Sequence, residues 1–287
     1  MKSLAAGLIC LLLLSDALAA PGVVRLLQAP AWRARGATRE PLQVGQELDS
    51  SDTVMTGAGA RALIGLSEGS LVKLGENAEL ALKDMQVPAE ENGVFKGVLD
   101  VLKGAFRFTT TIAGRHREIR AQVRTATIGI RGTDVWGKAE DARDFVVLLE
   151  GQISIEHAGH SYPIETANSL FMAPRGQAAL PIAPVNPDDL ARWAQETEPQ
   201  VAAGIVNVDG KYRLNLASYP SADGARRLAG ELATAGYGAT VESTTIAERG
   251  WWRVVIAGYA SRADAAATAG ALREPFHLAS PWVAGGR

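Results

Sequence analysis

Two stretches of the chain repeat one pattern: "YRLNLASYPSADGARRLAGEL" at Tyr212–Leu232 and "WRVVIAGYASRADAAATAGAL" at Trp252–Leu272. Eight of the twenty-one aligned positions are identical. Each copy begins with the alternation of apolar and polar residues that is typical of a β-strand, and it continues after a serine into an alanine-rich helical pattern. The segment "GATVESTTI" between the copies and "HLASPWV" after them supply two further strands. The repeat therefore predicts a β-α-β-β-α-β domain over residues 210–284.

This ferredoxin-like α+β topology places two helices on one face of a four-stranded antiparallel sheet and leaves the other face open. Because side chains alternate along a strand, Leu214, Leu216, Val254 and Ile256 should face the helices. The open face should present hydrogen-bonding and aromatic groups, which suit the hydroxyls and C–H surfaces of a polysaccharide. The candidate glycan-binding residues are Arg213, Asn215, Ser218, Tyr219, Arg253, Val255 and Tyr259. One alternative stays open, in which Tyr219 and Tyr259 only pack against the helices and the sheet face docks on the N-terminal half.

The motifs "YRLNLASY" and "WWRVVIAGY" make residues 210–284 resemble a SPOR domain. This resemblance implies a bacterial envelope module that binds peptidoglycan glycan strands stripped of stem peptides, which are enriched at division septa. Three features depart from the family pattern. Asn215 stands where glutamine is usual, Ala217 and Ala257 replace glycines, and Val255 occupies a position that is often polar.

The N-terminal half, over residues 20–185, contains short apolar alternations broken by Gly, Asn, Asp and Pro, which predicts an all-β roll or sandwich. The segment "VRTATIGIRGTDVWGK", Val123–Lys138, makes this half resemble a FecR domain, which implies a periplasmic scaffold for protein contacts. Within it, Arg131 and Asp134 are spaced to pair across a tight turn, and Thr133 can bond the local backbone. We interpret Arg131, Thr133 and Asp134 as a structural corner, with a protein-contact site as the alternative.

A short helix should follow the all-β half. Asn186 is a good N-cap, and Pro187 fits the first helical position. Trp193 should dock this helix on the all-β half. The remaining residues of segment 186–209 are interpreted as a linker.

The first nineteen residues are typical of a secretory signal peptide, with Lys2, an apolar run and a small-residue cleavage site ending at Ala19. The expected location is therefore the periplasm; an uncleaved membrane anchor is the alternative. No later apolar run approaches the length of a membrane span. A net charge of −2 argues against nucleic acid as a partner, although RNA-binding domains share the C-terminal topology.

The sequence predicts no catalytic site, no metal site and no cofactor. His157 and His160 lie three residues apart but lack a third ligand. The stretch Gly65–Gly69 has the spacing Gly-x-Ser-x-Gly, but it lies in an expected hairpin turn between strands and not at the strand-to-helix turn that a nucleophilic serine requires. The expected function is a non-enzymatic exported binding protein, in which the C-terminal domain binds peptidoglycan glycan and the N-terminal domain recruits another envelope component. Two alternatives are a periplasmic signalling module, whose N-terminal domain binds a transporter or sigma-regulator partner, and a cell-wall hydrolase.

Overall fold

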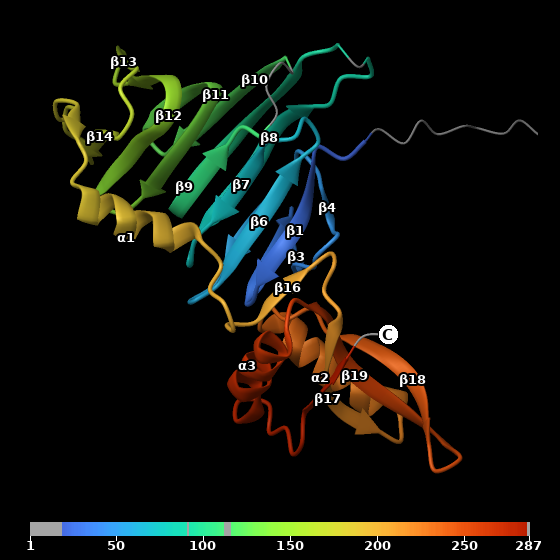
Figure 1. The fold of residues 1–287 in the computed structure, drawn as a ribbon. Coiled ribbons are helices and arrows are strands. Elements are labelled where there is room, and N and C mark those ends of the chain that lie inside the picture. The colour runs from blue at the N-terminus through green and yellow to red at the C-terminus, as the bar shows by residue number, and fades with distance from the viewer. Residues whose placement is uncertain (1–18, 91, 112–115, 286–287) are drawn as a thin grey trace, which may run out of the picture.

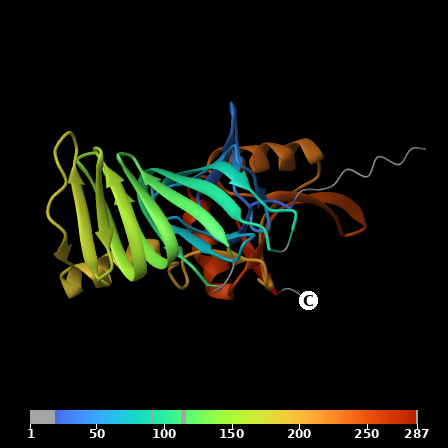
Figure 2. The ribbon, with the colours of Figure 1, turned by 90° about the horizontal axis from the view of Figure 1, so that it is seen from above.

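The computed structural model describes residues 19–90, 92–111 and 116–285. Residues 1–18, the body of the predicted signal peptide, lie outside the described residues. An all-β half is followed by an α+β half (Figure 1), as the sequence predicts. Figure 2 shows the green and yellow strands of the all-β half arrayed side by side, away from the orange and red α+β half.

The all-β half is a sandwich of two sets of strands. The first set contains β1 (Gly22–Gln28), β4 (Glu47–Leu48), β6 (Arg61–Leu66), β7 (Leu71–Leu74), β14 (Ser169–Pro174) and β15 (Ala183–Pro184). The second contains β2 (Ala31–Arg35), β3 (Thr38–Pro41), β5 (Asp52–Thr56), β8 (Glu79–Gln86), β10 (Arg117–Val123) and β13 (His160–Ile164). Apolar side chains from both sets, among them Ile64 and Leu80, form one buried core.

Three long strands belong to both sets because their two ends pair with different neighbours. These are β9 (Phe95–Thr109), β11 (Ala126–Ala139) and β12 (Arg143–His157). The first part of β9 pairs with β8 and β10, and its last part pairs with β7 and β11. The all-β half is thus closed by strands that pass from one layer to the other.

The structure corrects the predicted turn around Arg131, Thr133 and Asp134. This segment is a bulge inside β11, where the register with β12 shifts between Arg131 and Asp134. Gly132 has a φ of +57°, and Arg131 and Asp134 lie opposite Gln152 and Glu150 of β12, so the two residues follow one another along β11 instead of facing each other across a tight turn. The carboxylate of Asp134 instead binds the guanidinium of Arg107, with N–O distances of 2.6 and 2.9 Å. The buried hydroxyl of Thr133 has no hydrogen-bond partner among the described residues.

Helix α1 (Pro187–Thr197) begins as predicted, with the side chain of Asn186 accepting the backbone N–H of Asp188. The helix covers the outer surface of the first set of strands. The indole of Trp193 stacks on that of Trp136 with 5.4 Å between the ring centroids and 5° between the planes. The prediction that Trp193 docks this helix is therefore confirmed.

The α+β half has the predicted strand and helix order. Its sheet runs β18 (Thr240–Ile246), β19 (Arg249–Tyr259), β17 (Tyr212–Tyr219) and β20 (Trp282–Gly285), with every neighbouring pair antiparallel. Helices α2 (Ala222–Thr234) and α3 (Arg262–Arg273) pack on one face of this sheet. The four residues predicted to face the helices, Leu214, Leu216, Val254 and Ile256, all lie in the core between sheet and helices.

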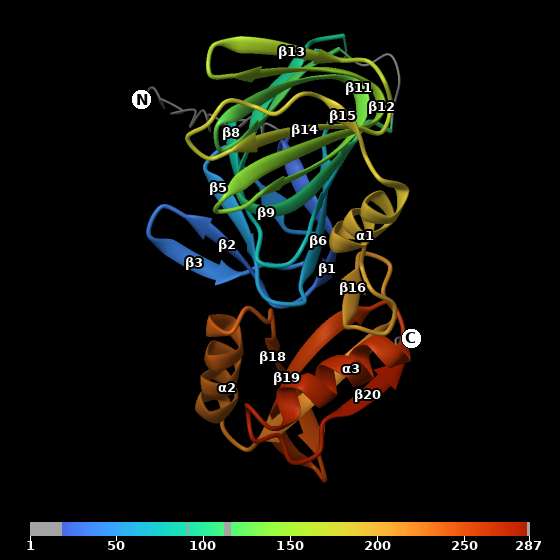
Figure 3. The same cartoon turned by 90° about the vertical axis from the view of Figure 1, so that its left-hand side faces the viewer.

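The two halves are in contact along a seam. Strand β16 (Ile205–Asn207) lies in the segment that the sequence presented as a linker, and it pairs with β1 and, through Val206, with Tyr259 of β19. Figure 3 shows the β2–β3 hairpin above α2. There, the indole N–H of Trp32 donates to the carbonyl of Thr234, with 3.2 Å between N and O.

Gly236 follows α2 and lies where the β2–β3 hairpin contacts the α+β half. Its φ of +86° ends α2 in a conformation that favours glycine. A Cβ atom at this position would lie 2.7 Å from the ring of Trp32, so only glycine lets the hairpin approach this closely. The carbonyl of Gly236 also accepts the N–H of Ala31, with 3.0 Å between N and O.

A buried carboxylate in the all-β half makes stability depend on pH. Asp52 is fully buried, and both of its oxygens accept from Arg35, at 2.7 and 2.8 Å. Burial alone would raise the pKa of Asp52, but hydrogen bonds from Arg35 and from the backbone of Asp49, with the charges of Arg35 and Arg33, outweigh burial and lower the pKa below its usual 3.8.

We expect Asp52→Asn to lower the free energy of unfolding by about 2 kcal/mol at pH 7, the value of a hydrogen bond to a charged group. A lowered folded-state pKa contributes stability that is fully present above the unfolded-state pKa near 4 and is lost as pH falls through the folded-state pKa. The difference between variant and parent in urea titrations should therefore shrink below about pH 4. Asp49→Asn, which removes a more exposed partner of the same arginine, is the control; an equal effect of both variants would contradict the assignment.

Candidate glycan-binding face

The sheet of the α+β half has an outer face that neither helix covers. Residues directly opposite in antiparallel strands point to the same side, so the registers define this face. Asn215 lies opposite Val255 and Trp282, Ser218 lies opposite Arg253, and Arg253 lies opposite Glu242. In the rest of the article the outer face means Arg213, Asn215, Ser218, Thr240, Glu242, Thr244, Trp251, Arg253, Val255, Ala257, Trp282 and Ala284.

Charged and aromatic groups of the outer face are in contact. The guanidinium of Arg253 lies over the ring of Trp282, with 5.0 Å from its carbon to the ring centroid, and its Nε donates to the hydroxyl of Ser218 at 3.4 Å. Arg213 forms an ion pair with Glu242 of β18. Trp282 keeps 42% of its surface exposed. The outer face therefore combines an open aromatic surface with fixed donors and acceptors, which is the chemistry that sugar rings require.

Two predicted contact residues of this face are buried, and the structure corrects their assignment. Asn215 is 2% exposed, and Val255 is fully buried. Both lie on the two central strands, between the larger side chains of Arg213, Arg253 and Trp282. The amide nitrogen of Asn215 donates to the carbonyl of Trp282 at 3.4 Å, so this side chain joins β17 to β20. Asn215 and Val255 therefore lie beneath the exposed side chains of the outer face and pack against them, without being accessible to a ligand.

The two predicted tyrosines turn toward the helices. Tyr259 is 1% exposed in the core, and Tyr219 is partly buried against the same core. The physical reason is a pair of bulges. A register shift between Asn215 and Ala217 reverses the alternation, so that Ser218 lies on the outer face and Tyr219 does not. A second shift, at Gly258 with φ +87°, turns Tyr259 inward.

The environment of Tyr259 agrees with a structural role. Burial raises the pKa of its hydroxyl far above the usual value, although a hydrogen bond with Thr268 works in the opposite direction. A neutral hydroxyl in the core does not meet a surface polymer. The structure therefore agrees with the alternative in which both tyrosines pack against the helices.

Among the outer-face residues that sequence reasoning missed are its two tryptophans, Trp282 and Trp251, and its carboxylate, Glu242. Trp282 stands in the short segment "HLASPWV", which has too few residues to show an alternation. Its place beside Arg253 depends on the pairing of β20 with β17, across nearly seventy residues of chain. The signal that could have identified Trp251 was its spacing of two residues from Arg253 on one strand.

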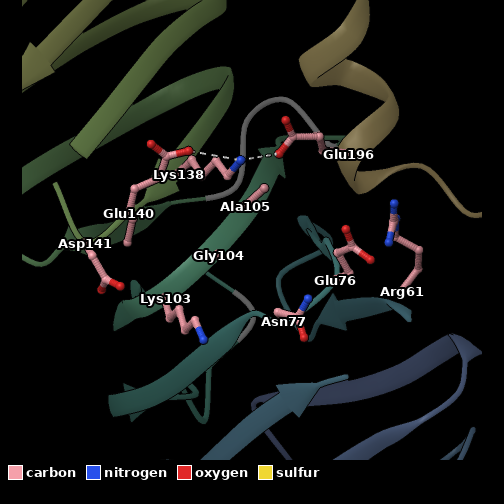
Figure 4. Close-up of a pocket in the computed structure, with 11 residues that line it drawn as sticks. Arg61, Glu76, Asn77, Lys103, Gly104, Ala105, Lys138, Glu140, Asp141 and Glu196 are labelled. Atoms are coloured by element: carbon pink, nitrogen blue, oxygen red, sulfur yellow. Dashed lines mark ion pairs between the residues drawn. The ribbon is translucent and has the colours of Figure 1, made fainter. Parts of the chain in front are cut away.

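A second concave region lies in the all-β half (Figure 4), with a volume of about 430 Å³. It is lined by charged residues of both signs, and no residue predicted as functional is among them. The ammonium of Lys138 lies 3.1 Å from Glu140 and 2.9 Å from Glu196. Burial lowers the pKa of Lys138, but these two carboxylates outweigh burial and raise it. An amine held in its protonated form is a poor nucleophile and a poor base.

Within the described residues, no three His, Cys, Asp or Glu side chains gather as a metal site would require. None of the helices in the described part of the chain has the length and apolar character of a membrane-crossing segment.

Comparison with known proteins identifies both halves. Residues 208–283 match the family model of the SPOR domain, and residues 52–154 match that of the FecR protein. No curated protein matches the sequence. SPOR domains bind peptidoglycan, both families are associated with the cell envelope, and neither is a catalytic family.

Two solved structures, each described as a proposed anti-sigma factor from Parabacteroides distasonis ATCC 8503, are similar to this chain. The 1.65 Å structure has a TM-score of 0.40 and 15% identity; the match covers 50% of this chain and 64% of the other, less than two thirds of its length. The 2.50 Å structure has a TM-score of 0.41 and 11% identity, and the match covers 73% of this chain and 99% of the other. The two family matches lead to one conclusion: the chain combines an N-terminal FecR domain, matched over residues 52–154, with a C-terminal SPOR domain, matched over residues 208–283.

Proposed function

We propose that this protein is a non-enzymatic periplasmic binding protein whose outer face binds peptidoglycan glycan strands that are poor in stem peptides. The observation that carries the proposal is the exposed Trp282 under the guanidinium of Arg253, next to the hydroxyl of Ser218. An aromatic face can stack on sugar C–H surfaces while the neighbouring donors bind ring hydroxyls. For the domain limits we propose residues 20–185 and 210–284, with 186–209 as the connection.

The direct test is retention of the purified full chain on sacculi, before and after an amidase removes the stem peptides. We expect stronger retention on the amidase-treated material, because stem peptides obstruct a flat sheet that must lie along the sugar chain. Equal retention on both materials, or retention on neither, would contradict the proposal.

We expect Trp282→Ala to weaken binding to amidase-treated sacculi about tenfold, since aromatic contacts and a cation–π pair contribute roughly 1–2 kcal/mol. Leu180→Ala, which removes a similarly exposed apolar side chain from the all-β half, is the control and should leave binding unchanged. Thermal unfolding of both variants would show that the fold is intact.

For the FecR domain we propose recruitment of another envelope component. The FecR match itself favours a second candidate function, a periplasmic signalling module that binds a transporter or sigma-regulator partner. Crosslinking of the full chain in cells discriminates the two. One dominant membrane-protein partner would favour signalling, whereas a cell-wall enzyme or septal protein would favour recruitment.

A further inference from the structure

A crevice of about 390 Å³ lies at the seam between the two halves. Leu27, Leu42 and Gln43 of the all-β half form one wall, and Tyr237, Ala257 and Gly258 of the α+β half form the other. Small-molecule sites have volumes of roughly 300–1,000 Å³ and occur preferentially at domain interfaces. Neither half alone would form this crevice.

The walls of the crevice are apolar with a few neutral polar groups. No charged side chain lines it among the described residues, and its polar side chains come from Gln43, Asn207, Tyr237, Thr240 and Thr268. Burial raises the pKa of Tyr237, so its hydroxyl stays neutral and can donate or accept a hydrogen bond. Apolar surface with scattered hydroxyl and amide groups matches an uncharged, N-acetylated sugar, whose acetamido group has both a methyl and an amide.

The crevice is continuous with the outer face. Thr240 and Ala257, which line the crevice, are themselves exposed residues of that face. Thr240 pairs with Val255, and Ala257 pairs with Arg213. A polymer that lies across Trp282 and Arg253 therefore reaches the mouth of the crevice along one sheet surface.

We propose that the crevice is a further subsite of the glycan-binding surface, which holds an N-acetylated sugar residue of the strand between the two halves. This inference rests on the proposed function. Under this inference the FecR domain takes part in glycan recognition through Gln43. It also gives a reason for the fixed arrangement of the two halves, which are joined by the pairing of β16 with β1 and by the hydrogen bond of Trp32.

The test measures binding of the full chain to amidase-treated sacculi with two variants. Tyr237→Phe removes one hydroxyl and keeps the ring, and Gln43→Ala removes one amide from the opposite wall. A neutral hydrogen bond contributes about 0.5–1.5 kcal/mol, so each variant should weaken binding roughly 2- to 10-fold. Matched controls are Tyr162→Phe and Gln152→Ala in the all-β half, away from the crevice, and these should bind as the parent does.

The outcomes separate this inference from the proposed function. If Trp282→Ala weakens binding while Tyr237→Phe and Gln43→Ala bind as the parent does, the crevice is not a subsite and the outer face alone binds glycan. If the parent itself is not retained on amidase-treated sacculi, the proposed function and this inference both fail.

Discussion

Replacing Asp264 with alanine is expected to lower the free energy of unfolding by about 3–5 kcal/mol, because buried N–H groups lose their acceptor. Asp264 is 3% exposed at the start of α3. Its Oδ1 accepts the backbone N–H groups of Gly204 and Ile205, at 3.2 and 3.1 Å, and its Oδ2 accepts the hydroxyl of Ser261 at 2.5 Å. The backbone N–H of Asp264 donates in return to that hydroxyl, which caps the helix.

The effect should extend to the seam, since Ile205 begins the strand that pairs with the all-β half. Denaturant titration followed by circular dichroism measures the loss. Asp223→Ala, at the start of α2, is the matched control, because this carboxylate is exposed and its ion pair in the described part of the chain is with Arg226, one turn along. Its removal should cost less than about 0.5 kcal/mol. A cost for Asp264→Ala no larger than that of the control would show that these buried bonds contribute little.

Replacing Trp193 with alanine is expected to cost about 3 kcal/mol, the lower end of the range for removing a packed tryptophan, because its ring is only partly buried. The ring stacks on Trp136 and lies 5.7 Å from the ring of Phe145. Apart from Trp193, helix α1 packs on this cluster through Leu190. Removing the Trp193 ring should therefore let water reach Trp136, which is almost fully buried in the parent.

Two readouts check this result: the unfolding free energy and the red shift of the tryptophan emission as Trp136 meets water. Arg192→Ala removes the neighbouring exposed side chain and should change neither quantity. An unchanged emission maximum for Trp193→Ala would mean that α1 stays docked without the stack.

Much of the α+β half could be predicted because its determinants are local. The alternation in Tyr212–Tyr219 and in the second copy of the repeat placed Leu214 and Val254 in the core, and the serines before each helix act as N-caps. Asn186 and Trp193 likewise marked α1 and its docking face. Periodicity and capping depend on neighbours a few residues apart, so one sequence suffices to identify them.

The composition of the outer face depended on pairing between distant segments. The bulges beside Asn215 and at Gly258 form only when β17 and β19 align, and they decide that Tyr219 and Tyr259 turn inward. Trp282 joins Arg253 only because β20 pairs with β17. A bulge of one residue moves every later side chain of the strand to the opposite face of the sheet. Beyond a bulge, the alternation of apolar and polar residues therefore no longer predicts which face a side chain lies on.

In the α+β half, the sequence by itself thus determined the order of strands and helices, the residues that form the core of the repeat and the residues that begin the helices. Tertiary structure alone decided which side chains reach the outer face, that Asp134 binds Arg107, and that the presumed linker is a strand joining the halves. The physical reason is that hydrophobic periodicity is set along the chain, whereas strand register and seam contacts are set across it, by segments far apart in sequence.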